Sequence, residues 1–425
     1  MFNKILANYH NFDQFLLNFS NESIQKNSFM SIRLLYCAIL GKKEITLIQG
    51  LKHTLKLIIR LVKLPFFVAE ISQKNSVLIV GKHRLDYEVS KLTKIPCTHI
   101  ELRKRQKFSA SAWKIYFKIL KIFGACIVQV IRNPILEWKI FFCSAYGLLD
   151  FLVTYYTVKL DGIKVIVTES DSMPIDFALL LKAKENNIKS IKIDHFLIDP
   201  INHNRLFCDY YFYPCLLHFN IMKSFNANSH VKYKEGGFLH WDQLAMYQYS
   251  PTLPKKICFF TQHGGILGQK DEIYYINEIL EVLPPSYTLS IKIHPFDSVE
   301  RYSIFQQNPN IEIVFGTIDN YALIAEATIC LSICSTLTLE AKHVCENSFF
   351  INYEPDSLKG FINYEGFHGV IETLTSREML SKAICGEFER TKIDNFLKGF
   401  NLSYPHAVKR LLSLIEEVNN EKTTL

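Results

Sequence analysis

Residues 328–344, TICLSICSTLTLEAKHV, contain the stretch that decides the fold class. Thr328–Leu331 is an apolar run of strand length, and the helical pattern Leu337–Val344 follows after a few polar residues. Short apolar strands that alternate with helices are typical of a parallel sheet covered on both faces. The stretch therefore predicts an α/β fold.

The same alternation extends in both directions along the chain. After residue 250 it predicts strands at Ile257–Thr261, Leu289–Ile293, Ile311–Phe315 and, as the last, Phe349–Asn352. Before residue 250 it predicts strands at Ser76–Lys82, Cys97–Leu102, Lys164–Thr168, Ile188–Asp194 and Leu206–Tyr213. A proline-rich break at residues 249–256 divides the two series. We therefore expect two Rossmann-like domains, 1–250 with extra N-terminal helices and 251–425, facing a cleft that binds ligands.

Composition and charge narrow the protein class. The chain has 425 residues, of which 48% are hydrophobic and 21% charged, which excludes a disordered or collagen-like polymer. Residues 1–125 hold 21 basic and 7 acidic residues, a net charge of +14, whereas residues 255–425 hold 15 and 22, a net charge of −7. The basic front predicts an anionic partner. The excess of basic residues falls on predicted helices rather than on the loops that follow the predicted strands. We therefore expect this part to contact a membrane face or an anionic acceptor polymer, and no nucleic acid.

Two basic helices are predicted in this front part, at Leu51–Phe67 and Ala112–Val128. In the first, Lys52, Lys56 and Arg60 share one helical face and apolar residues occupy the rest. Such helices lie in a lipid headgroup layer with their basic side chains towards phosphate. The alternative is an ordinary amphipathic helix with a solvated lysine face.

The cysteines and the apolar segments bear on the compartment. The eleven cysteines show no Cys-x-x-Cys pair, which predicts reduced thiols in a cytosolic protein and no structural metal. The first residues do not lead into a signal-peptide pattern. Ile140–Val158 has nearly spanning length but contains Asp150, which favours a buried helix. We expect a cytoplasmic protein at the inner face of the cytoplasmic membrane.

The candidate phosphate-binding residues follow the C-terminal strands. His294-Pro295 ends the strand Leu289–Ile293, and the proline fixes the turn that holds the imidazole at the end of the sheet. A histidine there can donate a hydrogen bond to a phosphate oxygen or act as an acid for a phosphate leaving group. Gly264-Gly265 follows another strand and lets backbone N–H groups approach a phosphate or sugar closely.

A second group of candidates opens the helix Leu337–Val344. Ser335 and Thr336 combine hydroxyls with the free N–H groups of a helix N-terminus, which is an anion site. Glu340 lies four residues after Thr336, where it can reach ribose hydroxyls. The alternative for Ser335 or Thr336 is a helix cap, and one side chain can serve both purposes.

These motifs resemble bacterial GT-B sialyltransferases and polysialyltransferases of capsule and lipooligosaccharide biosynthesis. His294-Pro295 matches the His-Pro motif of that family, and Ser335-Thr336 matches its Ser-Ser/Thr motif. The resemblance implies that both motifs hold the nucleotide phosphate of CMP-sialic acid, with no metal and no further cofactor.

The acidic motif of the family, an Asp/Glu pair followed by Gly in the N-terminal domain, has no match. Glu169 and Asp171, after the strand Lys164–Thr168, are the nearest carboxylates and candidate general bases for an acceptor hydroxyl. Asp171 is alternatively only a helix N-cap. Asp194-His195, which ends the strand starting at Ile188, provides the alternative base.

The sequence thus predicts an inverting, metal-independent glycosyltransferase that moves an acidic sugar from a CMP-donor to a surface glycan. Sialic acid is the leading candidate for this sugar. Three alternatives stay open within enzymes: a Kdo transferase, a CDP-glycerol-type phosphotransferase of surface polysaccharide and a sugar-nucleotide 2-epimerase. A non-catalytic GT-B scaffold is the fourth, because the acidic motif is missing.

Overall fold

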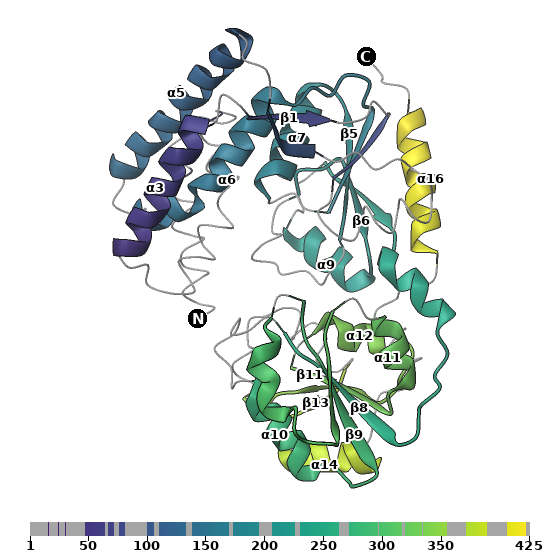
Figure 1. Ribbon diagram of the computed structural model, residues 1–425. Helices are drawn as coiled ribbons and strands as arrows, with labels where there is room; N and C mark the ends of the chain where they lie inside the picture. Colours follow the sequence, from purple (N-terminus) through teal and green to yellow (C-terminus); the bar gives the residue numbers. More distant parts are fainter. Residues whose placement is uncertain are drawn as a thin grey trace. The chain divides into compact units, whose positions relative to one another are not determined.

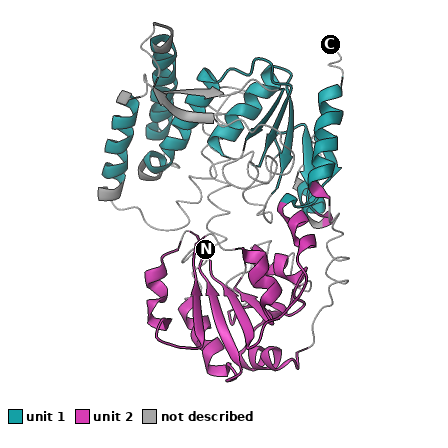
Figure 2. Cartoon of the chain, turned by 45° about the vertical axis from the view of Figure 1, so that its right-hand side comes forward, with its two compact units in different colours: residues 1–214, 218–239, 408–425 teal, residues 215–217, 240–407 magenta. Residues whose placement is uncertain are grey.

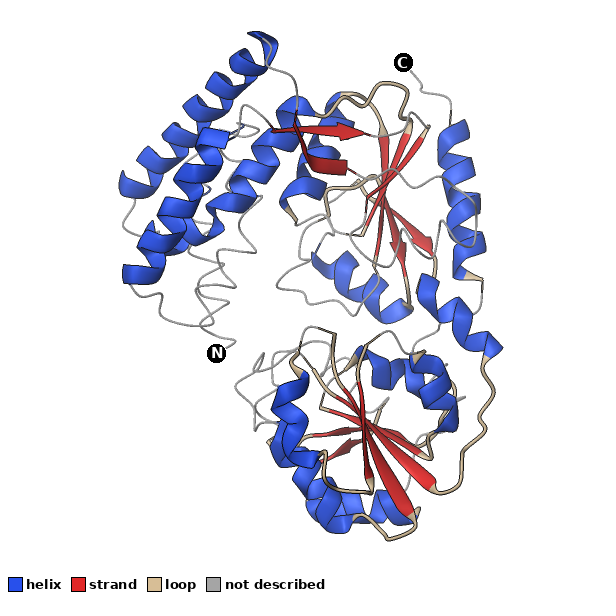
Figure 3. Ribbon diagram, viewed as in Figure 1, coloured by secondary structure: helices blue, strands red, loops and turns tan. Residues whose placement is uncertain are grey.

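The computed structural model describes most of the chain in segments. These are residues 47–63, 67–71, 76–80, 100–105, 110–132, 138–169, 173–194, 206–225, 230–262, 272–295, 297–316, 319–333, 335–354, 371–388 and 406–421, with the single positions 16, 24 and 30. They form two compact units, one of residues 1–214, 218–239 and 408–425 and the other of residues 215–217 and 240–407 (Figure 2). Each unit is an α/β structure built on its own parallel sheet, as the sequence predicted (Figure 3).

Unit 1 contains a five-stranded sheet whose neighbouring strands all run parallel. Its order is β2 (Val77–Val80), β4 (Val165–Thr168), β5 (Lys189–Ile193), β6 (Tyr210–Tyr213) and β7 (Lys232–Glu235). The central strands are buried apolar runs, and β4 is buried along its whole length. Sequence patterning missed β7, because its KYKE sequence is polar and half exposed at the edge of the sheet.

Three helices of unit 1, α3 (Leu47–Lys63), α5 (Ala110–Arg132) and α7 (Pro174–Glu185), pack on a long buried helix, α6 (Trp138–Thr157). Helix α9 (Leu216–Phe225) lies in the same unit from His218 onwards. Both α3 and α5 contact α6, which buries Phe141, Leu148 and Leu152 in the core (Figure 1). The prediction of a buried helix at 140–158 is confirmed, and among the described helices none is long and apolar enough to span a bilayer. Unit 1 also contains a separate antiparallel pair, β1 (Phe67–Ile71) and β3 (Ile100–Arg105); β1 was not predicted and begins at Phe67, where the predicted helix Leu51–Phe67 was to end.

Unit 2 contains a six-stranded parallel sheet with a reversal in strand order. Its strands are β8 (Lys255–Phe260), β9 (Tyr287–Lys292), β10 (Ile311–Val314), β11 (Ile329–Ser332), β12 (Ser348–Ile351) and β13 (Thr373–Leu374). The order is β10-β9-β8-β11-β12-β13, so three strands run outwards from β8 and three run the other way from β11. This is the 3-2-1-4-5-6 order of a dinucleotide-binding Rossmann sheet. The short β13 extends the sheet beyond β12, which was expected to be last.

The helices of unit 2 are α10 (Glu272–Val282), α11 (Asn320–Glu326), α12 (Thr336–Lys342) and α14 (Arg377–Cys385), with the 3₁₀ helices η2 (Leu239–Met246) and η3 (Val299–Phe305). The apolar faces of α10, α14 and η3 share one core with the strands, which includes Ile257, Tyr275, Leu289, Leu331 and Leu380. Aliphatic and aromatic burial of this extent is the main stabilising term of the unit.

The last helix, α16 (Ala407–Asn420), belongs to unit 1 from Val408 onwards, whereas we expected it to close the C-terminal domain. Its polar side pairs with the edge of the unit 1 sheet: Lys234 Nζ lies 2.8 Å from an oxygen of Glu417. Arg410 Nε donates to the carbonyl of Gly236 at 2.6 Å. Its apolar side is buried at Leu411, Leu414, Ile415 and Val418. The unit boundary of the structure therefore differs from the expected division at 250, since a C-terminal segment completes the first unit.

Replacing Leu411 with alanine should lower the free energy of unfolding by about 2–4 kcal/mol, because the truncation leaves a cavity at a buried site. Hydrogen exchange should rise in β6 and β7 and stay unchanged in β8 and β9. Glu416→Ala, on the exposed side of the same helix, is the matched control. Faster exchange confined to unit 2 would contradict the assignment of α16 to unit 1.

Candidate functional site

The reversal of strand order in unit 2 marks a place for a ligand. β8 and β11 are neighbours, and the chain leaves them in opposite directions across the sheet. The helices that follow two such strands diverge, so ligands of Rossmann sheets bind at the carboxyl ends of the strands at this point. Thr261 and Gln262 follow β8, and Ile333 and Ser335 follow β11. The described residues of these predicted site loops therefore lie at this edge of the sheet.

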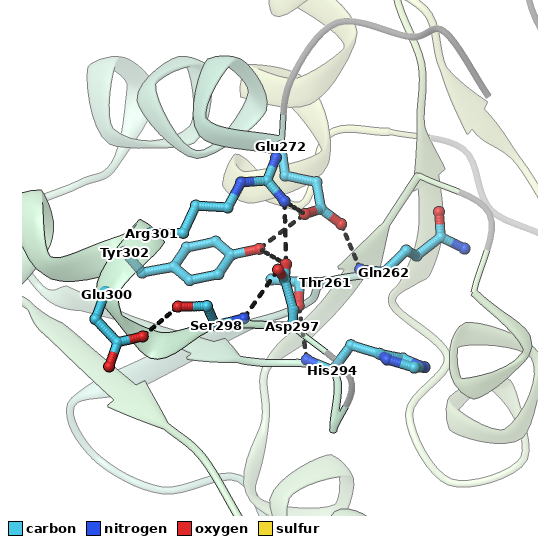
Figure 4. Close-up of polar contacts among 9 residues, drawn as sticks. All are labelled: Thr261, Gln262, Glu272, His294, Asp297, Ser298, Glu300, Arg301 and Tyr302. Atoms are coloured by element: carbon cyan, nitrogen blue, oxygen red, sulfur yellow. Dashed lines mark hydrogen bonds and ion pairs between the residues drawn. The ribbon is translucent and has the colours of Figure 1, made fainter. Parts of the chain in front are cut away.

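His294 is held at the same edge by its backbone. It comes two residues after β9, and its N–H donates a 2.8 Å hydrogen bond to Oγ1 of the buried Thr261, which follows β8. The N–H of Thr261 donates in turn to the carbonyl of Lys292 at 3.0 Å. The imidazole is partly exposed and points away from the neighbouring carboxylates (Figure 4). Pro295, beside it, is exposed, so the His-Pro pair is placed as predicted, with its backbone fixed and its ring accessible.

A buried polar cluster lies behind this loop (Figure 4). It consists of two carboxylates, an arginine and a tyrosine: Glu272, Asp297, Arg301 and Tyr302. The hydroxyl of Tyr302 lies 2.8 Å from an oxygen of each carboxylate. Nη1 of Arg301 lies 3.1 Å from Glu272 and 3.0 Å from Asp297. One arginine and one phenol thus join α10 to the loop that carries His294.

The two carboxylates of this cluster differ in electrostatic environment. Burial raises the pKa of Glu272, although hydrogen bonds from the Gln262 N–H and from Tyr302 oppose it. Burial also acts on Asp297, but hydrogen bonds from Tyr302 and the Ser298 N–H, together with Arg301, outweigh it and hold the pKa of Asp297 below its usual range. Burial and both carboxylates raise the pKa of Tyr302, so this phenol stays protonated and donates.

Ser335 is the N-cap of α12. Its Oγ accepts a hydrogen bond from the N–H of Leu337 at 3.2 Å, and its own N–H donates to Oγ of Ser332 at 2.9 Å. The capping role that the sequence left open is therefore confirmed for Ser335. An acceptor role at the cap does not use the hydroxyl proton, which can still be donated to an anion. Thr336 begins the helix and is partly exposed.

Glu340 lies elsewhere than expected. Only 2% of its side chain is exposed, and its Oε1 lies 3.1 Å from Nε2 of His240, inside unit 2. One turn of α12 carries it from the exposed edge at Thr336 into the interior. The contact with His240 takes the place of the contact with a ribose that the sequence spacing suggested.

The candidate bases of unit 1 are only partly described. Glu169 follows β4 and is buried. Asp194 follows β5 and is also buried: it accepts a hydrogen bond from the Tyr211 hydroxyl, and Lys192 Nζ lies 3.7 Å from its Oδ1. These contacts hold Asp194 inside unit 1, and its role as the alternative base stays a prediction. Asp171, His195, Gly264 and Gly265 lie outside the described residues, so their predicted roles stay predictions.

Sequence analysis missed the cluster behind His294. Asp297 and Arg301 are an i,i+4 pair just after the His-Pro motif, and this spacing could have suggested their ion pair. Glu272 could not have been found in this way, because it is 25 residues before Asp297 and only the sheet brings the two together. Within the described part of the chain, no group of three or more His, Cys, Asp or Glu residues could hold a metal ion.

No protein-family model and no curated protein sequence matches the chain. Among solved structures, it is similar to a UDP-GlcNAc 2-epimerase from Methanocaldococcus jannaschii, at 12% identity and a TM-score of 0.45, over 80% of this chain and 99% of that one. The UDP-GlcNAc 2-epimerase from Neisseria meningitidis bound to UDP-GlcNAc gives the same values. The wall teichoic acid polymerase TagF is 12% identical with a TM-score of 0.46, over 89% and 98% of the two chains. Similarities this distant carry no conclusion about substrate or reaction.

Replacing Asp297 with asparagine should lower the free energy of unfolding at pH 7 by about 1–2 kcal/mol, because it removes the charge that pairs with Arg301. The folded-state pKa lies below the ordinary value of 3.8, so this stabilisation is present above 3.8 and is lost as the pH falls through the folded-state pKa. Urea unfolding from pH 7 down to about pH 2 should therefore show the difference shrinking.

Glu300→Gln is the control for this experiment, because Glu300 lies on the same 3₁₀ helix and is exposed. It removes only an exposed contact with Ser298 and should shift the urea midpoint at pH 7 much less than Asp297→Asn does. A loss at Asp297→Asn that is equal at both ends of the pH range would show that packing, and not charge, supports the loop.

Proposed function

We propose that the chain is an inverting, metal-independent glycosyltransferase that transfers an acidic sugar from a CMP-donor to a surface-glycan acceptor. Sialic acid is the leading candidate for this sugar. The observation that carries the proposal is the position of His294. It is fixed through its backbone to Thr261, one strand away from the switch point of a Rossmann sheet, with its ring accessible. A nucleotide phosphate at the carboxyl ends of β8 and β11 would lie within the reach of such a side chain.

The chemistry required of His294 is stabilisation of a leaving group. In the transfer, an acceptor oxygen forms a bond to the anomeric carbon, and the bond from that carbon to the phosphate oxygen breaks. The electron pair stays on the departing phosphate oxygen, where negative charge develops. A preorganised N–H donor aimed at this oxygen lowers the barrier more than it strengthens ground-state binding.

Ser335 and Thr336 complete the proposed phosphate site. Ser335 precedes α12 as its N-cap and Thr336 begins the helix, both at the carboxyl end of β11. The cap does not use the hydroxyl proton of Ser335. We assign Gly264 and Gly265 the role of giving the donor close access to the backbone after β8.

Proton removal from the acceptor hydroxyl needs a base, for which we propose Asp171 or Glu169. Of these, Glu169 follows β4 directly at the carboxyl edge of the unit 1 sheet. A carboxylate that takes this proton as the new bond forms would satisfy direct displacement with inversion. We place the reaction in surface-polysaccharide assembly, such as capsule or lipooligosaccharide.

A panel of CMP-sugars, CDP-glycerol and UDP-sugars tests the donor, with nucleotide release as the readout. CMP release in the presence of a glycan acceptor is expected. Release of CMP from CDP-glycerol would indicate a phosphotransferase, and acceptor-free conversion of a UDP-sugar, followed by NMR, would indicate an epimerase. Either result would overturn the glycosyl-transfer proposal.

His294→Ala should lower kcat by about 10²- to 10⁴-fold while leaving the thermal unfolding midpoint within a degree or two of the original, since the ring is partly exposed. His230→Ala, at an exposed histidine of unit 1, is the matched control and should retain full turnover. Full activity of His294→Ala would exclude the assigned role.

A further inference from the structure

Helix α3 exposes a group of large apolar side chains. Leu51, Leu55, Ile58 and Ile59 are 55%, 61%, 51% and 47% exposed. At 100° per residue, Leu51, Leu55 and Ile58 fall within about 60° of one another, and Ile59 lies beside them. Contiguous exposure of large aliphatic side chains marks an interaction surface.

The opposite face of α3 is the one that packs on unit 1. Leu57 is buried there, and Arg60 turns inwards to form an ion pair with Asp150 on α6. The guanidinium of Arg60 also lies 5.3 Å from the ring centroid of Tyr146. The face of α3 that packs on unit 1 is thus already occupied. The aliphatic stripe of Leu51, Leu55, Ile58 and Ile59 lies outside this packing face. This arrangement differs from the alternative of an ordinary amphipathic helix, because large apolar residues are exposed together with the lysines.

Exposed lysines accompany the aliphatic stripe. Lys52 and Lys56 are exposed along one side of it. Helix α5, which also packs on α6, has a similar exposed face: Phe117 is 60% exposed, between Lys114, Lys118 and Lys121, all of them exposed. Both helices therefore present large apolar side chains together with basic ones and, on these exposed faces, no carboxylate.

We propose that the exposed faces of α3 and α5 dock on an anionic lipid surface. Aliphatic side chains enter the boundary between headgroups and acyl chains, and the lysines contact lipid phosphates. The charge favours this occupant over a second copy of the chain, because self-association through α3 would bring the lysines of one copy against those of the other. The proposal concerns the location of the protein and does not depend on the donor.

Vesicle co-sedimentation of the full chain tests the proposal. Vesicles of phosphatidylcholine with about 30% phosphatidylglycerol should bind the protein at least tenfold more tightly than phosphatidylcholine alone, and added salt should weaken the binding. Leu55→Ser with Ile58→Ser should weaken binding at least tenfold. Lys52→Glu with Lys56→Glu should weaken it on the order of 30-fold or more.

Matched variants keep the result interpretable. Ile304→Ser removes an aliphatic side chain that is 66% exposed in unit 2, and Lys164→Glu reverses an exposed charge of unit 1 outside these helices. Both should bind vesicles as the parent protein does, and circular dichroism should show that every variant is folded. Unchanged binding by the two α3 variants would overturn the proposal. So would a change in molecular mass by light scattering without any change in vesicle binding, which would make this face a contact between copies.

Discussion

The hydrogen bond from the His294 N–H to the Thr261 hydroxyl is the constraint on which the candidate site depends. It links the ends of two neighbouring parallel strands by joining Thr261, after β8, to His294, after β9. Thr261 is buried, and an unmade hydrogen bond at a buried group costs about 1–3 kcal/mol. The bond therefore holds the backbone of His294, whose side chain is partly exposed at the end of the sheet.

The polar cluster of Glu272, Asp297, Arg301 and Tyr302 extends this constraint to α10. Two carboxylates so close together repel each other, and Arg301 and the Tyr302 hydroxyl offset the repulsion. Buried networks of this kind favour one arrangement because each alternative leaves a charge unpaired. Unit 2 thus has a rigid support behind an accessible histidine, which is the arrangement that preorganised electrostatic stabilisation requires.

In unit 1, the basic residues of α3 differ from one another in their surroundings. Arg60 is drawn inwards to Asp150, whereas Lys52 and Lys56 stay outside with the aliphatic side chains of α3. Helical periodicity showed that basic and apolar residues occupy separate sides of this helix, and that part of the prediction stands. Which side faces the protein depended on α6, whose Asp150 and Tyr146 match an arginine better than they match a row of leucines. No spacing within α3 contains this information.

The sequence by itself determined the alternation of strands and helices, the parallel sheets and the positions of His294, Ser335 and Thr336 after strands, because these follow from local apolar runs and turn residues. Polar or very short edge strands such as β7 and β13 carry no such local signal. Only the tertiary structure decided the strand reversal at β8 and β11, the burial of Glu340 against His240, the joining of Glu272 to Asp297 and the return of α16 to unit 1. Each of these is a pairing between residues far apart in the chain, and its energy exists only once the sheets have brought the partners together.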